Sequence, residues 1–288
     1  LKVSHSALER FLRALCALGL AERRGRSYHA SQAAQQYLCA DSPCFLGDMF
    51  RHSLTLCDQW SRIGEAVKTG EMPPPPESRL RGYEDQLGAF LKSMHAAGMI
   101  QSAKVLEMID LKKTDALLDL GGGLGTYAVA AVQRCGCARA TVYDLPDVVE
   151  HAREFICNEG VQDRVLVHAG QCLCDPLPPG PFDCVVISQL LHMYCEKDCR
   201  SIVTKACRVL RDTGVLAVHD YAGGCGDALS VSLVDMTMLT GTPQGMCHTA
   251  SDIHGWMEAS GIDDIQTAPV PGGSAVLWGH RKGSPGYD

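Results

Sequence analysis

Residues 117–125 read LLDLGGGLG, and this stretch decides the fold. Residues 117–120 form a mostly apolar run of strand length, a cluster of glycines follows, and the helix-like segment TYAVAAVQRC comes next. The order strand, glycine turn, helix is how an α/β fold brings its backbone close to a nucleotide-like ligand. Glycine is needed there because only a residue without a Cβ lets the chain turn tightly and lets a ligand touch the main chain.

Two acidic residues near this turn indicate which ligand it holds. Asp144 ends the next predicted strand about 20 residues later, where a carboxylate can accept hydrogen bonds from both ribose hydroxyls. Asp119 lies within the motif itself, close to where the pyrophosphate of a dinucleotide would sit. A carboxylate there repels a dianion and attracts the cationic sulfonium and amino groups of S-adenosylmethionine. The sequence therefore predicts S-adenosylmethionine as the cofactor, with a dinucleotide as the alternative.

The composition is that of a globular chain with a sizeable core. Of 288 residues, 46% are hydrophobic and 20% are charged, which predicts one large domain and a smaller one. The net charge of −7 does not point to nucleic acid or to an anionic membrane. No apolar run approaches the ~18–20 residues that a membrane span needs. The chain opens at Leu1 rather than Met, so we expect natural N-terminal residues to be missing.

Fifteen cysteines are many for this length, and their number is odd and their spacing irregular. Four of them fall within apolar or helical patterns: Cys16, Cys157, Cys184 and Cys207. We therefore expect most of the cysteines to be reduced, buried side chains in a cytoplasmic protein. The CxxC repeats and Cys/His pairs that are typical of zinc sites are absent, and no metal site is predicted.

The N-terminal residues have the pattern of a winged helix. Residues 6–18 predict a helix that begins near Ser6. LAERRGRSYHAS then predicts a hairpin with Gly25 in its turn, and Ser31 begins a second helix. Arginines gather here, which leaves a dimerisation and substrate-lid module or a DNA-binding element as alternatives. The first is favoured because the rest of the chain is acidic, so nucleic acid is not expected as a partner. The helix carries one apolar stripe, made of Leu8, Phe11, Leu12, Leu15 and Leu18.

Helical and strand patterns alternate along the rest of the chain. Residues 45–69 and 84–110 have helical periodicity and flank a proline-rich loop at 71–83. From residue 117 onward, strands and helices alternate as in a doubly wound, mostly parallel sheet. The last strand follows PVPGG directly, so it should pair antiparallel with the segment before it. The predicted strands are 116–120, 139–143, 164–168, 182–188, 214–219 and 274–280.

Ligands of such sheets bind at the carboxyl ends of the strands, and the residues there form the predicted site. We expect Asp144 to hold the ribose, Gln171 to pair with an adenine edge, and Ser188 to donate to the amino-acid tail of the cofactor. The predicted cofactor-binding residues are Asp119, Gly121, Gly123, Asp144, Leu145, Gln171, Cys172 and Ser188.

Two strand ends carry the candidate catalytic residues, His192, Asp220 and His219. His192 follows the predicted strand 182–188, at the rim where the methyl group would emerge. An imidazole there can take a proton from an acceptor hydroxyl or thiol. The next strand ends in His219 and Asp220, and Asp220 can either orient a histidine and stabilise its protonated form or cap a loop.

The chain resembles the S-adenosylmethionine-dependent O-methyltransferases typified by acetylserotonin O-methyltransferase and the plant caffeate and flavonoid enzymes. Five segments carry the resemblance: LLDLGGGLG, ATVYDLPDVVEHAREFI, DRVLVHAGQCLCDPLP, FDCVVISQLLHMY and GVLAVHDY. It implies an α/β, doubly wound Rossmann-like methyltransferase sheet at 106–288 and an N-terminal helical winged-helix dimerisation domain at 1–105. The resemblance also implies a homodimer in which the N-terminal helical domain pairs the subunits and closes the substrate site. The resemblance assigns Gly121, Asp144 and Leu145 to the cofactor. It assigns His192 to catalysis.

The chain departs from the motifs of this family at several positions. The Asp and Trp that follow the catalytic histidine are Met193 and Tyr194, and the Asp of a Gly-Asp pair is Gln171. The two glutamates of the plant enzymes correspond to His219 and Cys247. The plant-type His/Glu/Glu arrangement is therefore not intact. The first helices of the dimerisation domain have no counterpart, as expected of a chain that starts late.

The leading hypothesis is a cytoplasmic methyltransferase that methylates an oxygen of a small molecule with His192 as general base. One alternative is methylation of sulfur by the same fold, because a thiol needs less help from a base and a thioether needs none. Another alternative is a winged-helix DNA-binding regulator with a ligand-sensing α/β domain. Its DNA affinity would depend strongly on salt.

Overall fold

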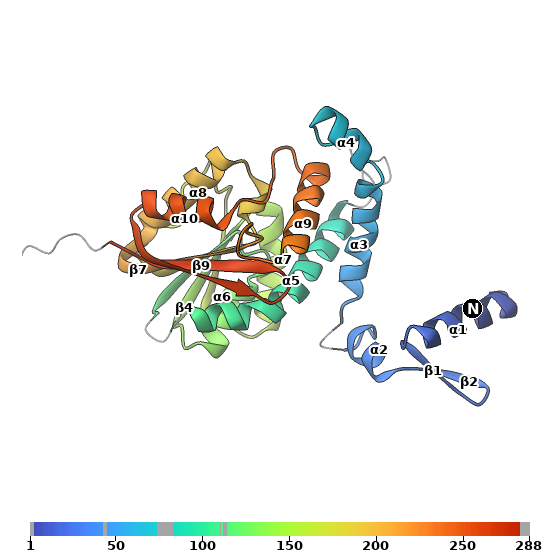
Figure 1. Ribbon diagram of the computed structural model, residues 1–288. Helices are drawn as coiled ribbons and strands as arrows, with labels where there is room; N and C mark the ends of the chain where they lie inside the picture. The colour runs from blue at the N-terminus through green and yellow to red at the C-terminus, as the bar shows by residue number, and fades with distance from the viewer. Residues whose placement is uncertain (1–2, 43–44, 74–82, 110, 112–113, 283–288) are drawn as a thin grey trace, which may run out of the picture.

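A seven-stranded mixed sheet forms the centre of the molecule (Figure 1). The computed structural model describes residues 3–42, 45–73, 83–109, 111 and 114–282. The strands lie in the order β5-β4-β3-β6-β7-β9-β8, with β9 and β8 antiparallel to their neighbours and the others parallel. The predicted doubly wound sheet is confirmed, including the antiparallel hairpin at its end. The strands are Ala116–Leu120 (β3), Arg139–Asp144 (β4), Val165–Ala169 (β5), Phe182–Ser188 (β6), Leu210–Asp220 (β7), Ile262–Val270 (β8) and Ser274–Arg281 (β9).

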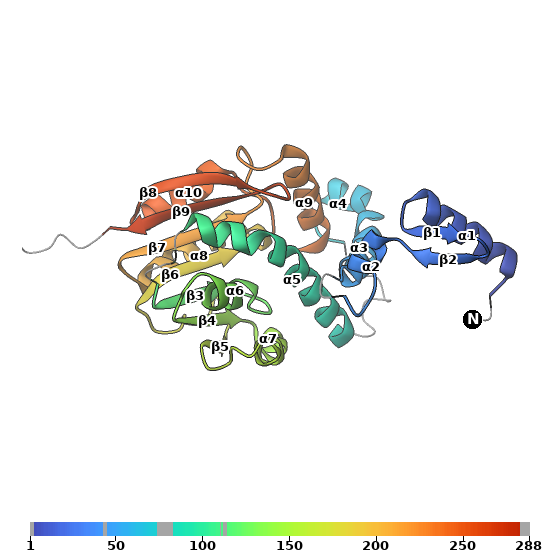
Figure 2. The same ribbon diagram turned by 90° about the horizontal axis from the view of Figure 1, so that it is seen from below.

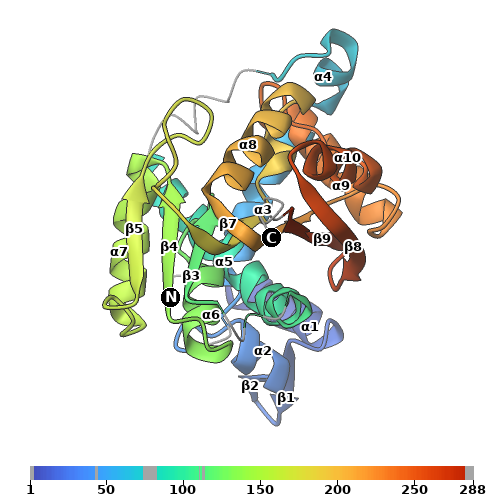
Figure 3. The ribbon, with the colours of Figure 1, turned by 90° about the vertical axis from the view of Figure 1, so that its left-hand side faces the viewer.

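Helices cover both faces of the sheet because alternate strand residues point to opposite sides. Leu117 of β3 belongs to a buried cluster with side chains of α5, α6 and α7, whereas Leu118 belongs to one with α8 and α10. In Figure 3, α7 lies beside β5 at one edge of the sheet and α10 lies beside β8 and β9 at the other. The result is a three-layered α/β/α sandwich. The helices are Tyr83–Met108 (α5), Thr126–Arg134 (α6), Pro146–Asn158 (α7), Glu196–Val209 (α8) and Ala250–Ala259 (α10).

Three predicted elements differ from the observed ones. The strand predicted at 214–219 begins earlier, because Leu210 already pairs with Phe182 before a register irregularity. The helix predicted at 45–69 is two helices, α3 (Gly47–Trp60) and α4 (Ile63–Thr69), since Arg62 between them leaves helical dihedral angles (φ −107°, ψ 9°). The break lets α4 pack against α9 (Ala228–Gly241). The first helix is capped by the hydroxyl of Ser4 rather than by Ser6.

The long helix α5 belongs to both parts of the chain. Its first half packs against α3, and its second half covers the sheet with the buried side chains of Val105 and Leu106. The domain boundary that we placed after residue 105 therefore lies inside a continuous helix. Most of the proline-rich loop predicted at 71–83 lies outside the described residues.

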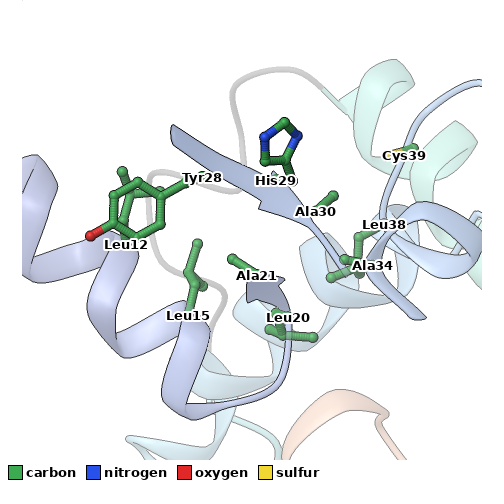
Figure 4. Close-up of a pocket in the computed structure, with 10 residues that line it drawn as sticks. All are labelled: Leu12, Leu15, Leu20, Ala21, Tyr28, His29, Ala30, Ala34, Leu38 and Cys39. Carbon is green, nitrogen blue, oxygen red and sulfur yellow. The ribbon is translucent and has the colours of Figure 1, made fainter. Parts of the chain in front are cut away.

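The N-terminal helix, hairpin and second helix stand apart from the sheet (Figure 2). They are α1 (His5–Ala17), β1 (Ala21–Arg24), β2 (Ser27–Ala30) and α2 (Gln32–Tyr37), with Gly25 at φ +62° in the hairpin turn. An apolar hollow of about 310 Å³ lies between them, lined by Leu12, Leu15 and Leu38 among others (Figure 4). Helix α1 buries none of its side chains. The order of elements agrees with a winged helix, which itself remains a prediction.

The cysteines are less buried than we expected. Cys184 and Cys207 lie in the core, but Cys157 is exposed and Cys16 is half-buried, because their positions on the helices face outward. The 14 cysteines among the described residues are free thiols. In the same part of the chain, none of the helices has the length and apolar character to span a membrane.

Candidate active site

The carboxyl ends of four parallel strands bring the predicted site residues to one edge of the sheet. The strand register places Leu120 of β3 level with Tyr143 of β4 and Ile187 of β6, and Ser188 level with His219 of β7. The residues that follow these levels are the glycine turn, Asp144, the loop that carries His192, and Asp220. These residues therefore meet at the carboxyl ends of the parallel strands, as the sequence predicts.

The backbone conformation of the glycine turn requires glycine at two positions. Gly121 has φ +70° and Gly123 has φ +56°, a left-handed conformation that favours glycine. A Cβ on Gly121 would lie 2.8 Å from the side chain of Leu190, on the loop after β6. The N–H of Gly123 donates to Asp144 Oδ2 over 2.8 Å, which ties the turn to the end of β4. The turn is therefore held in a glycine-dependent conformation, between the loop after β6 and the end of β4.

Asp119 is fully buried, and its carboxylate is only half satisfied. Its Oδ2 accepts the N–H of Ala128 in α6 at 3.1 Å, whereas Oδ1 has no hydrogen-bond partner among the described residues. Burial, helped by the charge of Asp144 and opposed by the Ala128 hydrogen bond, raises the pKa of Asp119 to about 7. An unpaired buried acceptor is costly, so this atom fits a donor or a cation supplied by a ligand.

Asp144 marks the other end of the predicted cofactor site. Burial raises the pKa of its carboxyl, while hydrogen bonds from the backbone of Gly123 and Leu145 lower it. Leu145 is 47% exposed, as a residue that covers a flat ligand would be. Each carboxylate oxygen of Asp144 keeps an unused lone pair, and a ribose hydroxyl can donate to it.

Part of the Gln171 side chain, which was predicted to bind the cofactor, is used in hydrogen bonds within the loop after β5. The amide oxygen of Gln171 accepts from the N–H of Leu173 and of Cys174, both at 2.9 Å, so only its amide NH₂ is left for a ligand. Cys172 lies against the hydroxyl of Tyr194 at 3.6 Å. This contact joins the loop after β5 to the segment that carries His192.

His192 and Asp220 form the closest polar pair of the site. The short helix Leu191–Met193 after β6 holds His192, whose Nδ1 lies 2.5 Å from Asp220 Oδ1 at the end of β7. Asp220 is fixed in turn by the N–H groups of Leu191 at 2.8 Å and Tyr221 at 2.8 Å. Within the described part of the chain, His192 Nε2 has no partner. A histidine oriented in this way can accept a proton at Nε2.

The charges of this pair support each other. Burial lowers the pKa of His192, but the charge and hydrogen bond of Asp220 outweigh it, and the pKa lies above its ordinary value. Burial raises the pKa of Asp220, but His192 and the backbone hydrogen bonds hold it below its ordinary value. Asp220 therefore stays ionised and stabilises the imidazolium that forms when His192 takes a proton.

His219 belongs to a separate, buried set of hydrogen bonds. Its Nδ1 lies 2.7 Å from the hydroxyl of Tyr127 and 3.3 Å from that of Ser188, and its Nε2 lies 2.7 Å from the hydroxyl of Ser274. The side chain is completely buried, and burial lowers the pKa of His219 to about 4. An acid–base role for His219 is not supported, since the acceptor cannot reach it. Tyr127 and Ser274 carried no signal in the sequence, because nothing in the helix after the glycine turn or at the start of β9 shows that either side chain meets His219.

Comparison with known proteins agrees with this geometry. A family profile described as the O-methyltransferase domain matches residues 80–263, more than half of the chain. The chain is 29% identical to the tetracenomycin polyketide synthesis 8-O-methyl transferase TcmO of Streptomyces glaucescens, over 94% of this chain and 81% of that protein. It is 28% identical to the 3-hydroxy-5-methyl-1-naphthoate 3-O-methyltransferase of Streptomyces sahachiroi, over 94% of this chain and 80% of that protein.

A solved structure has the same fold. Human N-acetylserotonin methyltransferase in complex with SAM superposes with a TM-score of 0.84 and 22% identity, covering 98% of this chain and 85% of that one. The chain therefore belongs to the O-methyltransferase family and methylates an oxygen of a small molecule with S-adenosylmethionine as methyl donor.

Proposed function

We propose that His192 is the general base of an O-methyltransferase that acts on an aromatic hydroxyl. The observation that carries this proposal is the 2.5 Å contact between His192 and Asp220 at the edge where the glycine turn opens. S-adenosylmethionine supplies an electrophilic methyl group on its sulfonium. As the acceptor oxygen takes the methyl group, its proton passes to His192 Nε2, and Asp220 balances the new charge.

The raised pKa of His192 suits a phenol-like acceptor. A phenol has a pKa near 10, so a stronger base narrows the gap between proton donor and proton acceptor. Asp220 provides that strength by holding the pKa of His192 above its ordinary value. The names of the two Streptomyces relatives refer to a polyketide and to a hydroxynaphthoate, which supports an aromatic acceptor here as well.

For the cofactor we propose a cradle at the edge of the sheet. Asp119 Oδ1 would accept from the cationic end of S-adenosylmethionine, and Gly121 and Gly123 would leave room for it against the main chain. Leu145 and Cys172 would lie beside the adenine, with Gln171 offering its amide NH₂ to the ring edge. Asp144 would hold the ribose, and Ser188 would donate to the amino-acid tail.

A screen with labelled S-adenosylmethionine tests the choice of acceptor. The panel should pair a naphthol with the matching thiol and methyl thioether, and it should include an aliphatic alcohol of similar size. We expect label on the oxygen of the naphthol and little on the alcohol. Label that appears on sulfur alone would overturn the proposed acceptor.

The exchange Asp144→Ala should weaken S-adenosylmethionine binding by about 1.5–3 kcal/mol, because charge-assisted hydrogen bonds to the ribose are lost. Titration calorimetry measures this directly. Asp147→Ala is the matched control, since Asp147 is an exposed acid in the first turn of α7 and should leave the affinity unchanged. Equal affinities of the Asp144 variant and the wild type would rule out the ribose assignment.

We also propose that the chain forms a homodimer through its N-terminal elements. Helix α1 buries none of its side chains, and Phe11 and Leu18 are 60% and 71% exposed, which leaves an apolar stripe for a second copy to cover. Light scattering at micromolar concentration should give twice the mass of the chain, and Phe11→Asp should shift it toward the single-chain mass. A wild-type monomer under these conditions would contradict the proposal.

The remaining proposals rest on sequence alone. The odd number and irregular spacing of the cysteines are typical of a chain kept reduced, which supports a cytoplasmic location. The family assignment favours the enzyme over a DNA-binding regulator. Independence from nucleic acid remains a prediction from the acidic net charge.

A further inference from the structure

The buried set of hydrogen bonds around His219 runs from the long helix to the edge of the cofactor site. Gln101 of α5 donates through Nε2 to the carbonyl of Pro271 at 3.0 Å, which fixes the orientation of its amide, because that carbonyl can only accept. The same Nε2 lies 3.5 Å from the hydroxyl of Ser274. Ser274 is completely buried and lies 2.7 Å from His219 Nε2.

These contacts, together with the Gln189 amide, whose Nε2 lies 3.5 Å from His219 Nε2, indicate which ring nitrogen of His219 carries the proton. If Nε2 carried it, the Ser274 hydroxyl would face two donors, Gln101 and His219, and its own proton would have no acceptor among the described residues. An unsatisfied buried donor is costly. With the proton on Nδ1, Ser274 accepts from Gln101 and donates to His219 Nε2, and both groups are satisfied. His219 is uncharged at neutral pH because burial lowers its pKa to about 4.

With the proton on Nδ1, the hydroxyl groups on that side of the ring face a donor rather than an acceptor. His219 Nδ1–H then donates to the Tyr127 hydroxyl at 2.7 Å. The same N–H faces the Ser188 hydroxyl at 3.3 Å, so Nδ1 cannot accept the proton of Ser188. Ser188 is half-buried at the end of β6, so its own proton is left to point into the site. With the opposite tautomer, Nδ1 is an acceptor, so the Ser188 hydroxyl can turn its proton toward Nδ1 and present only lone pairs to the site.

We propose that His219 is a positioning residue whose Nδ1–H tautomer makes Ser188 a hydrogen-bond donor toward the carboxylate of the cofactor's amino-acid tail. The inference rests on the proposed contact between Ser188 and that tail. In this way the buried His219 acts on the cofactor site without touching the reactants. The neighbouring Asp220 acts instead on His192. The chain of hydrogen bonds runs from Gln101 through Ser274 and His219 to Ser188.

Two-bond ¹H–¹⁵N correlation spectra of histidine-labelled protein without cofactor at pH 7 identify the tautomer. We expect His219 to carry its proton on Nδ1, whereas a proton on Nε2 overturns the proposal. The spectrum needs no turnover, so it is independent of whether His192 is the base. If His192 is not the base, turnover of the His192 variant will show it, and the tautomer of His219 will be unaffected.

A double-mutant cycle on S-adenosylmethionine affinity tests the consequence. Ser188→Ala should weaken binding by about 3- to 10-fold, the loss of one hydrogen bond, and Ser274→Ala should weaken it by a smaller factor. The combined variant should bind like Ser188→Ala alone, because Ser274 acts only through Ser188. Additive losses would overturn the proposal. Ser260→Ala is the matched control, since its hydroxyl joins α10 to Thr204 of α8 away from this chain. If the Ser274→Ala variant does not fold, the tautomer of His219 measured in the wild-type protein is the deciding test.

Discussion

Replacing His192 by alanine should lower kcat by about 10²–10⁴-fold while the affinity for S-adenosylmethionine stays the same. The imidazole takes the proton of the acceptor hydroxyl, and no other base lies at its place beside Asp220 in the described structure. Steady-state turnover of a naphthol, together with calorimetry of cofactor binding, separates the two quantities. Added imidazole should restore part of the rate by occupying the space that the side chain leaves.

The wild-type pH profile and a second histidine variant complete this test. The base works in its neutral form, so kcat should fall as the pH drops through a pKa that Asp220 holds above the ordinary histidine value. His280→Ala is the matched control, because this exposed histidine pairs with Val215 at the opposite end of the sheet. Full turnover of the His192 variant on a hydroxyl acceptor from about pH 6 to pH 9 would exclude His192 as the base.

Asp220→Asn should also lower kcat by about 10²–10⁴-fold, although it changes only one oxygen to a nitrogen. The uncharged amide no longer stabilises the imidazolium of His192, and burial alone then lowers the pKa of His192. The acid limb of the kcat profile should therefore move to lower pH, while the plateau falls because the base is weaker. Asparagine is the choice because it can still accept a hydrogen bond from Leu191 and keeps the loop in place.

Asp212→Asn is the matched control for this exchange, since Asp212 is an exposed acid near the opposite end of the same strand. It should alter neither the plateau nor the acid limb. A thermal melt of both variants checks that the fold is retained. An Asp220→Asn enzyme with the wild-type profile would mean that Asp220 only caps the loop after β6, the alternative that the sequence left open.

The parts of this structure that were predictable are those that depend on local patterns. The glycine turn follows from residues 117–125, where positive φ values at Gly121 and Gly123 require glycine. The gathering of Asp144 and His192 at one edge follows because parallel strands end at the same side of a sheet. The sequence left two roles open for Asp220, which were to orient a histidine or to cap a loop. Its pairing with His192 is possible because β6 and β7 are neighbouring strands of the sheet.

The unpredicted features depend on contacts between distant segments or on local competition. Tyr127 and Ser274 meet His219 only because α6 covers the face of the sheet next to β7 and β9 pairs with β7, and no spacing in the sequence marks them. Gln171 was expected to give its whole amide to the ligand, but its oxygen is used by neighbouring N–H groups of its own loop. Such local hydrogen bonds are frequent for amide side chains and cannot be told from ligand contacts by residue type.

Helix α5 is a rigid element that is shared by the N-terminal part of the chain and the sheet. With 26 residues it is about 39 Å long, and along that length each turn is held to the next by backbone hydrogen bonds. Midway along it, Gly98 lets the helix approach Thr126 closely, and His95 Nδ1 lies 2.8 Å from the Thr126 hydroxyl, directly after the glycine turn. A tilt of the N-terminal half of α5 would therefore displace Thr126, the first residue after the glycine turn. Any movement of the N-terminal elements would thus be coupled to the position of the glycine turn through a single helix.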